Sequence, residues 1–348
     1  MKGVRIVGSG LIGTSIALAL ASKGVPIQMV DSDNGRAALA QDLVGSVEVR
    51  EVELVVLSLP TSHLPEVIEE EFSLNSKAAF IDVGSVKTKP LHQIEKITGL
   101  SSRFCGSHPM AGREIGGPEA ARSDLFLGRP WIYTPSPDCN KEVISRVIWL
   151  IETLGALPIR MSPDEHDSAV ALISHLPQIA ASLLARELHV GPESWLALAG
   201  QGVRDTTRIA ASDPRLWREI IGMNREKIRP LLITMSEDLT NFISEFDDDN
   251  AIEEFIAEGR SGRERIPGKH GGRPRDYTYL PIVIEDKPGQ LAALFQECAE
   301  VQVNIEDLSI EHSPGQFTGL ITLALSRVEA DRLAVHLESR GWNVHSPR

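Results

Sequence analysis

The feature that most constrains the fold is a glycine-rich run near the amino terminus, Gly8-Ser9-Gly10-Leu11-Ile12-Gly13. It directly follows an apolar stretch, Val4–Val7, and opens an apolar-faced helix pattern. In this context Gly8 permits a tight turn, Gly10 lets the backbone approach a pyrophosphate, and Gly13 lets the helix pack on the sheet. We therefore predict a dinucleotide site built from Gly8, Gly10, Leu11, Ile12 and Gly13. The alternative is a plain strand–helix turn.

An acid follows the second predicted strand at the position that selects the nucleotide. Asp31 lies 18 residues after Gly13 and ends the apolar run that begins at Pro26. A carboxylate there accepts hydrogen bonds from the adenosine ribose hydroxyls and repels a 2′-phosphate. The next residues, Ser32 to Asn34, include no basic side chain. The pattern favours NAD over NADP, unless Asp31 is only a surface acid.

The rest of the chain divides into regions of different texture. Short apolar runs alternate with amphipathic stretches over residues 1–161, which predicts an α/β Rossmann-type doubly wound, mostly parallel sheet. Residues 162–258 show helical spacing, beginning at a Ser162-Pro163 start signal and including one long helix from about Pro214 to Phe246. Residues 259–276 have a Gly-rich, basic linker composition, read either as a tether or as a contact for an acidic partner. Residues 277–348 predict a βαββαβ, ferredoxin-like domain.

Composition narrows the class of protein. The chain has 35 basic and 48 acidic residues, a net charge of −13, which argues against a general nucleic-acid binder. The longest uninterrupted apolar runs are shorter than the roughly 20 residues of a membrane helix, so we expect no membrane span. Three cysteines without CxxC spacing argue against a disulfide scaffold or a cysteine zinc site, and no metal is expected. We expect a cytoplasmic protein.

Two polar runs follow predicted strands, at the edge where ligands bind in such sheets. They are Asp82–Lys87, and Ser107–Glu114, in which His108 directly precedes Pro109 and a glycine follows at Gly112. A histidine on a loop at this edge could exchange a proton near neutral pH. The helical region adds His166, the run Ser174–Gln178, and Arg208, whose planar guanidinium suits a carboxylate.

Together these motifs resemble the prephenate/arogenate dehydrogenases of tyrosine biosynthesis over essentially the whole chain. The resemblance rests on GxGLIGxS, DVGSVK, SHPMAGRExxG, SHLP and RDTTRIAxSDPxLW, the last ending at Trp217. It implies NAD-dependent oxidation of the ring hydroxyl carbon of a cyclohexadiene acid, with loss of CO2 and aromatisation. Prephenate would be the substrate and 4-hydroxyphenylpyruvate the product, or arogenate and tyrosine.

The same resemblance implies roles for single residues. His108 would take the proton of the substrate hydroxyl, Ser85 would bind that hydroxyl or orient His108, and Arg208 would bind a substrate carboxylate. Further residues would line or gate the cleft, or else act as caps, salt bridges or core aromatics; they are Arg113, Glu114, His166, Asp205 and Trp217. Gln178 stands where many family members carry a second histidine, so its part in binding the side-chain end of the substrate is open.

Two other functions compete with this one. A β-hydroxyacid or imine reductase would share the Rossmann domain but place a helix lysine at the chemistry, for which Lys227 is the candidate. A regulator that binds NAD and an amino acid without turnover is the alternative from another class, although His108, Ser85 and Arg208 would then have no use.

Residues 277–348 resemble an ACT domain, carried by the DKPGxL turn at Asp286–Leu291. The resemblance implies an amino-acid effector, most plausibly tyrosine, bound by Gly289 and Gln290 at the helix start and by Asn304 and Ile305 on the second strand. A domain that only supports dimerisation is the alternative. The apolar helix faces of the middle region, with the family's habit of pairing there, lead us to expect a homodimer.

Overall fold

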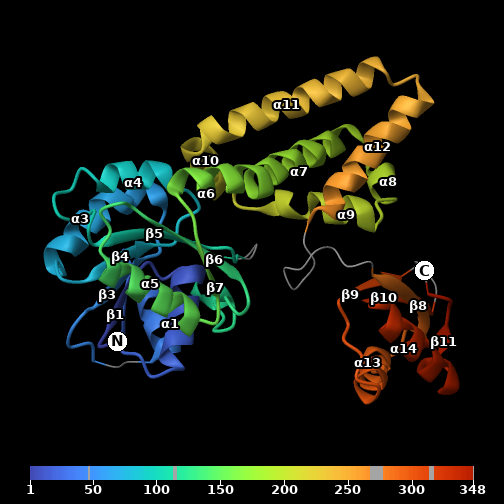
Figure 1. The fold of residues 1–348 in the computed structure, drawn as a ribbon, viewed down its shortest axis with the longest axis horizontal. Helices are drawn as coiled ribbons and strands as arrows, with labels where there is room; N and C mark the ends of the chain where they lie inside the picture. Colours follow the sequence, from blue (N-terminus) through green and yellow to red (C-terminus); the bar gives the residue numbers. More distant parts are fainter. Residues whose placement is uncertain (46–47, 113–115, 267–276, 313–316, 348) are drawn as a thin grey trace. The chain divides into compact units, whose positions relative to one another are not determined.

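The computed structural model describes residues 1–45, 48–112, 116–266, 277–312 and 317–347, drawn in Figure 1. The chain separates into two compact units, Met1–Asp238 and Leu239–Arg348. Each unit has its own fold.

The first unit is built on a seven-stranded sheet in the order β2-β1-β3-β4-β5-β6-β7. All neighbouring strands pair in parallel except β5 and β6, which are antiparallel. This confirms the predicted mostly parallel sheet. The strands are β1 Val4–Val7, β2 Ile27–Val30, β3 Leu54–Leu57, β4 Ala79–Asp82, β5 Phe104–Pro109, β6 Pro130–Pro135 and β7 Leu157–Arg160.

Helices cover both faces of this sheet, and each face has its own apolar core. Helices α1 (Leu11–Ala21), α2 (Asn34–Val44) and α5 (Lys141–Thr153) pack on one face, through side chains such as Leu20 and Val147. Helices α3 (Leu64–Leu74) and α4 (Thr88–Ile94) pack on the other, through Ile68 and Ile94. Because both faces are covered, β3 and β4 are buried throughout, and both are apolar except for Asp82 at the end of β4.

The helical part of the first unit begins where the sequence predicts. Ser162 caps α6 in a capping box with Glu165, and Pro163 occupies the first helical position. The helices are α6 Pro163–Val170, a π-helical turn Ala171–His175, α7 Leu176–Glu187, α8 Glu193–Leu196, α9 Gln201–Thr207, α10 Pro214–Met223 and α11 Arg225–Ser244, of which the part from Leu239 belongs to the second unit.

The predicted long helix from Pro214 to Phe246 is two helices, broken at Asn224. The Asn224 side chain is buried and bonds the Asp167 carbonyl (2.8 Å) and the ring of His175 (3.1 Å). These tertiary bonds hold the backbone of Asn224 away from helical geometry, at φ −108° and ψ 24°. A periodicity of apolar residues cannot reveal such a break.

One helical stretch, Pro163–Val190, is long and apolar enough by length and composition to cross a membrane, with a mean hydropathy of 1.5. The expectation of no membrane span rested on uninterrupted apolar runs, which do not reveal this stretch because polar residues interrupt it. His166, Asp167 and His175 interrupt this stretch and are buried in hydrogen bonds of the first unit. These contacts tie the stretch to the first unit through its polar side chains, while only 28% of its apolar window is buried.

In the second unit α12 runs from Asp249 to Glu264, beyond the start of the span 259–276 predicted as a linker. Asp248 caps its amino terminus, and Arg260 pairs with Glu264 one turn later at 2.9 Å. The Arg260–Glu264 pair stabilises the last turn of α12, which explains why the helix enters the predicted linker. The remainder of that span, 267–276, lies outside the described residues.

The carboxyl-terminal part is a four-stranded antiparallel sheet in the order β11-β8-β10-β9, with two helices on one face. Its elements are β8 Thr278–Glu285, α13 Gln290–Glu300, β9 Asp307–His312, β10 Thr318–Leu325, α14 Arg327–Ser339 and β11 Asn343–Val344. Asn304 and Ile305 precede β9 instead of lying on it, as the sequence reading had placed them. Val303 and Glu306 turn inward beside them, so the chain enters the core before the strand begins.

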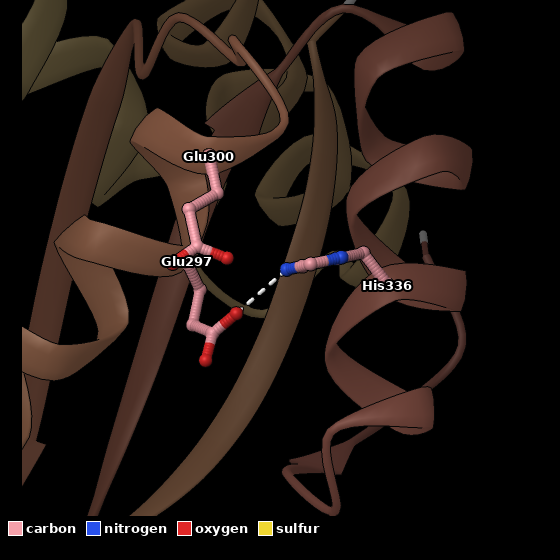
Figure 2. A group of neighbouring side chains, drawn as sticks. All are labelled: Glu297, Glu300 and His336. Atoms are coloured by element: carbon pink, nitrogen blue, oxygen red, sulfur yellow. Dashed lines mark hydrogen bonds and ion pairs between the residues drawn. The ribbon is translucent and has the colours of Figure 1, made fainter.

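A polar network ties α13 to α14 (Figure 2). His336 Nε2 lies 2.6 Å from Glu297 Oε2, and Glu300 lies one turn further along α13. Arg340 donates to Glu300 at 3.0 Å and lies 3.8 Å from Glu297. Because the guanidinium already supplies a cation to both carboxylates, we assign the network a structural role.

Candidate active site

The glycine-rich turn after β1 has the geometry of a nucleotide cradle. Gly8 has φ +105°, and a Cβ there would lie 1.9 Å from the carbonyl oxygen of Ser58. A Cβ on Gly13 would lie 2.0 Å from the Gly8 carbonyl oxygen, whereas one on Gly10 would meet nothing within 4 Å. Gly8 and Gly13 are thus required by packing, and the open side of Gly10 leaves room for a phosphate. Leu11 and Ile12 form the first turn of α1, whose start has no side-chain cap and can bind an anion.

Asp31 follows β2 and contacts this turn directly. Its Oδ2 accepts the Ser9 N–H at 2.6 Å, and its Oδ1 accepts the Asp33 N–H at 2.9 Å. Lone pairs of a carboxylate remain for two ribose hydroxyls. The Ser9 hydroxyl is buried in the same turn without a hydrogen-bond partner among the described residues. The turn and its acid therefore fit a dinucleotide with an unmodified ribose.

His108 lies within a strand rather than on a loop after it. Strand β5 continues to Pro109, and His108 pairs with Ile132 of β6. The apolar pattern predicts that this strand ends at Gly106, but antiparallel pairing with β6 extends β5 through Ser107, His108 and Pro109. The half-buried ring of His108 is consequently carried by a rigid backbone.

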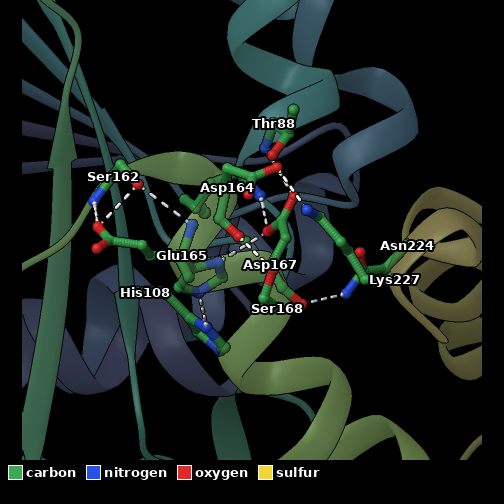
Figure 3. A network of polar contacts seen from close by, with 12 residues as sticks. Thr88, His108, Ser162, Asp164, Glu165, Asp167, Ser168, Asn224 and Lys227 are labelled. Atoms are coloured by element: carbon green, nitrogen blue, oxygen red, sulfur yellow. Dashed lines mark hydrogen bonds and ion pairs between the residues drawn. The ribbon is translucent and has the colours of Figure 1, made fainter. Parts of the chain in front are cut away.

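A chain of hydrogen bonds runs from His108 into the protein (Figure 3). His108 Nδ1 lies 2.9 Å from His166 Nε2, and His166 Nδ1 lies 2.8 Å from Asp167 Oδ1. Asp167 also accepts the backbone N–H groups of Lys87 (2.8 Å) and Thr88 (2.9 Å) at the start of α4. His166, expected to line the cleft, is fully buried behind His108.

A buried ion pair supports the backbone beside His108. Lys87 Nζ donates to the Asp82 carboxylate and, at 2.6 Å, to the carbonyl of Ser107. Asp82 Oδ1 accepts the Ser107 N–H at 3.0 Å. The run Asp82–Lys87 is recognisable in the sequence, but nothing there predicts a role for Asp82, Lys87 or Asp167. Their adjacency to His108 depends on the fold.

The electrostatic surroundings keep the histidines neutral. Burial lowers the pKa of His108 well below its usual value; His166, Lys87 and His175 act in the same direction, and Asp167 opposes them. Burial also lowers the pKa of His166, although Asp167 and Asp82 partly offset it. The pKa of His175 falls to about 4 through burial. A neutral imidazole at pH 7 can act as a base.

Two of the predicted substrate residues line one cavity of about 350 Å³ between α7 and α10. Gln178 is buried in its wall and donates weakly to Ser182 at 3.3 Å. Trp217 lines it too and stands edge-on to His175, with ring centroids 5.9 Å apart. The cavity thus lies beside the histidine cluster.

The other predicted residues are placed less closely. Ser85 is half-buried in the connection from β4 to α4. Asp205 is exposed on α9 and accepts from Gln201 at 2.7 Å, and Arg208 is exposed at the end of that helix. Arg113 and Glu114 lie outside the described residues.

Lys227, the residue that a reductase of the other type would need, does not reach the histidines. Its Nζ pairs with Asp164 at 2.6 Å (Figure 3). That contact joins α11 to α6 and gives Lys227 a structural partner.

Comparisons with known proteins identify the family of this chain. Residues 16–159 match the family model "Prephenate dehydrogenase, nucleotide-binding domain", and residues 162–258 match "Prephenate dehydrogenase, dimerization domain". A probable prephenate dehydrogenase, NovF, of Streptomyces niveus is 29% identical over 99% of this chain and its own full length. A cyclohexadienyl dehydrogenase of Zymomonas mobilis is 31% identical, covering 78% of this chain and 99% of that protein.

Among solved structures, prephenate dehydrogenase from A. aeolicus in complex with hydroxyphenyl propionate and NAD+ is similar, with a TM-score of 0.69 and 29% identity. The match covers 77% of this chain and 99% of the other. The α/β domain that carries the glycine turn and Asp31 is therefore an NAD-binding domain. Taken with the two family models, these matches show that the chain belongs to the prephenate dehydrogenase family.

Proposed function

We propose that the protein is an NAD-dependent prephenate dehydrogenase, which oxidatively decarboxylates prephenate to 4-hydroxyphenylpyruvate in tyrosine biosynthesis. The observation that carries this is His108, a neutral base on a rigid strand of the NAD-binding domain, backed by a buried histidine–aspartate pair. NAD, when bound, accepts a hydride. The chain must then bind the diene acid and handle one proton.

The site residues divide these tasks. His108 takes the proton of the ring hydroxyl, with Ser85 binding or orienting that hydroxyl. Arg208 binds a substrate carboxylate through its guanidinium fork. Gln178 and Trp217 receive the side-chain end in the cavity that they line. Arg113, Glu114 and Asp205 gate or line the rest of the cleft, and His166 acts through His108.

The test is absorbance at 340 nm after mixing the protein with NAD and prephenate, with arogenate in a parallel sample. NADH and CO2 formed from prephenate support the proposal, and no turnover with either substrate contradicts it. Faster turnover with arogenate would instead identify an arogenate dehydrogenase. Gln178 is the residue of interest here, because its neutral amide can face either the keto or the amino group that distinguishes the two.

The apolar surface of the helical domain supports a homodimer. Large side chains on and after α6–α7 are more than half exposed in a single chain: Leu172, Ile173, Leu183, Val190, Trp195 and Leu198. Exposed apolar surface of this extent marks an interaction site. Light scattering should give twice the chain mass of 38.0 kDa at micromolar concentration, and the monomer mass would contradict the dimer.

We further propose that the carboxyl-terminal part is a ferredoxin-like ACT domain that binds an amino-acid effector. Its element order is βαββαβ, and Gly289 precedes α13 in the left-handed region with φ +91°. The Gln290 N–H donates to the Lys287 carbonyl at 3.3 Å, so an effector carboxylate would bind the other N–H groups of the first turn of α13. Asn304 and Ile305, in the segment before β9, would contact the amino group across a paired domain. Removing residues 267–348 should abolish inhibition by tyrosine, and unchanged inhibition would place any effect at the active site.

A further inference from the structure

We propose that Asp167 and His166 are positioning residues that fix the tautomer of His108, so that its Nε2 is the base, and that receive the proton's charge during turnover. This rests on the proposed dehydrogenase function for the reaction itself. The tautomer, in contrast, follows from the hydrogen bonds alone.

Asp167 sets the direction of the chain of hydrogen bonds. Its Oδ1 accepts the Lys87 N–H and its Oδ2 accepts the Thr88 N–H, and backbone N–H groups can only donate. Burial raises the pKa of Asp167, but the hydrogen bonds from His166, Thr88 and Lys87 outweigh it and leave the pKa below its usual value. Asp167 is therefore an anion that accepts every bond made to it.

The tautomers of both rings follow from that anion. His166 must donate its Nδ1–H to Asp167, which leaves a lone pair on Nε2 when the ring is neutral. His166 Nε2 then accepts, so His108 donates its Nδ1–H. The lone pair of His108 is consequently on Nε2, the nitrogen that points away from His166. The arrangement follows the logic of an aspartate that orients a catalytic histidine, with one imidazole inserted between them.

The movement of the substrate proton explains what the hydrogen-bonded chain His108–His166–Asp167, here called the relay, would do during turnover. Bound NAD would accept the hydride with the electron pair of the C4–H bond, and His108 Nε2 would take the hydroxyl proton as the C4=O bond forms. The Nδ1 proton of His108 can shift to His166 Nε2, which places the cation against Asp167. Loss of CO2 then pushes the electrons of the ring carboxylate bond onto the oxygen at C4, and the proton returns to it by the reverse route. No net proton is released, so the relay stores the proton only for the lifetime of the intermediate.

Other charged groups near the two imidazole rings favour or oppose a positive charge on each ring. Lys87 opposes a positive charge on either ring, and His175 opposes one on His108. Asp167 favours a cation on both rings, and Asp82 favours one on His166. The cation is therefore better placed on His166, which touches the carboxylate, than on His108.

The first test reads the tautomer without substrate. In ¹⁵N-histidine spectra of the full-length protein, the signals lost in His108→Asn identify that ring among the 10 histidines. We expect a protonated Nδ1 and an unprotonated Nε2 at pH 7. The opposite tautomer would overturn the proposal whether or not the protein turns over prephenate, and so separates its failure from failure of the proposed function.

The second test uses three variants. Asp167→Asn can donate to His166 Nδ1 and so reverses both tautomers, and we expect kcat to fall by about 10²–10⁴ with a small change in KM. His166→Gln can still accept from His108 but cannot hold a charge, and should lose roughly 10- to 100-fold in kcat. His336→Gln removes a comparable histidine–carboxylate contact in the other unit and should keep full activity.

If Asp167→Asn fails to fold, because it caps the start of α4, His166→Gln and the spectra of the unaltered protein still decide. A kcat within twofold of normal in His166→Gln would overturn the storage role. An Nε2–H on His108 would overturn the tautomer.

Discussion

The two units each contain a histidine bonded to a carboxylate, and the pairs differ in everything but that bond. His166 and Asp167 are 2.8 Å apart, with side chains 0% and 3% exposed. His336 and Glu297 are 2.6 Å apart, with both side chains 18% exposed (Figure 2). A similar distance thus occurs in two very different dielectric surroundings.

The connections of the two pairs explain their different uses. Asp167 accepts two further backbone N–H groups, and Nε2 of His166 is hydrogen-bonded to Nδ1 of His108. The chain of hydrogen bonds therefore ends at the proposed base. Glu297 instead shares Arg340 with Glu300, and the second nitrogen of His336 leads to no other titratable group among the described residues. The His166–Asp167 pair can serve catalysis because it is buried from water and hydrogen-bonds a base. The His336–Glu297 pair is partly exposed and only joins two helices.

The largest expected difference between the two networks is kinetic. His108→Asn removes the base at the end of the first network and should lower turnover by about 10²–10⁴, with NAD binding unchanged. His336→Gln should leave turnover within twofold. Steady-state rates at 340 nm and NAD titrations check both; near-normal turnover in His108→Asn would refute its role.

A difference in stability should follow at the ion pairs. Lys87 and Asp82 have side chains 1% and 3% exposed, so Lys87→Met leaves an unpaired buried anion and should cost about 3–5 kcal/mol of unfolding free energy. Lys287 and Glu285 are 66% and 59% exposed, and Lys287→Met should cost less than about 1 kcal/mol. Urea unfolding of both variants measures this. Equal costs would show that burial does not separate the two regions.

The first unit should also be more sensitive to acid. His108, His166 and His175 have lowered pKa values, so below the unfolded pKa of about 6.5 the unfolded chain binds protons that the folded chain does not. Stability of this unit should therefore be constant above pH 7 and fall as the pH drops from 6.5 toward 4. Each histidine contributes up to about 1.4 kcal/mol per pH unit.

Hydrogen exchange of amides in β3 to β5 reports this unit separately. His175→Gln should reduce the decrease of stability with falling pH by the contribution of one histidine, up to about 1.4 kcal/mol per pH unit. His336→Gln serves as the control, and a slope unaltered by His175→Gln would contradict the neutral, buried state of that ring.

The smallest effect is expected at the helix tie of the second unit. His336→Gln removes a partly exposed bond and should lower the local stability of α13 and α14 by at most about 1 kcal/mol. Hydrogen exchange of those helices measures the loss. A larger cost would mean that the network supports the domain as strongly as the buried one supports the site.

The sequence predicts what local chemistry decides. The glycine turn, the acid after β2 and the Ser162 cap each depend on residues within one strand–turn–helix, and all three lie where expected. The βαββαβ order of the last part also follows from local periodicity.

What the sequence could not show are contacts between distant segments. His108 and His166 are 58 positions apart, and Lys87 lies 80 positions before Asp167. The adjacent residues His166 and Asp167 do not reveal in the sequence that His108 bonds to them. The break at Asn224 and the extension of β5 through His108 likewise depend on tertiary partners.

The most direct test of the account is the pH dependence of kcat/KM, which reports the base of the free enzyme. Burial, His166, Lys87 and His175 all lower the pKa of His108. The neutral, basic form of His108 should therefore be lost to protonation only well below the usual pKa of about 6.5. Measured by brief assays after a pH jump, kcat/KM for prephenate should stay level as the pH falls from 8 through 6.5 and decline only at lower pH. A half-maximal value at pH 6.5 or above would show a solvated, ordinary histidine, and would contradict the buried relay as the source of the base.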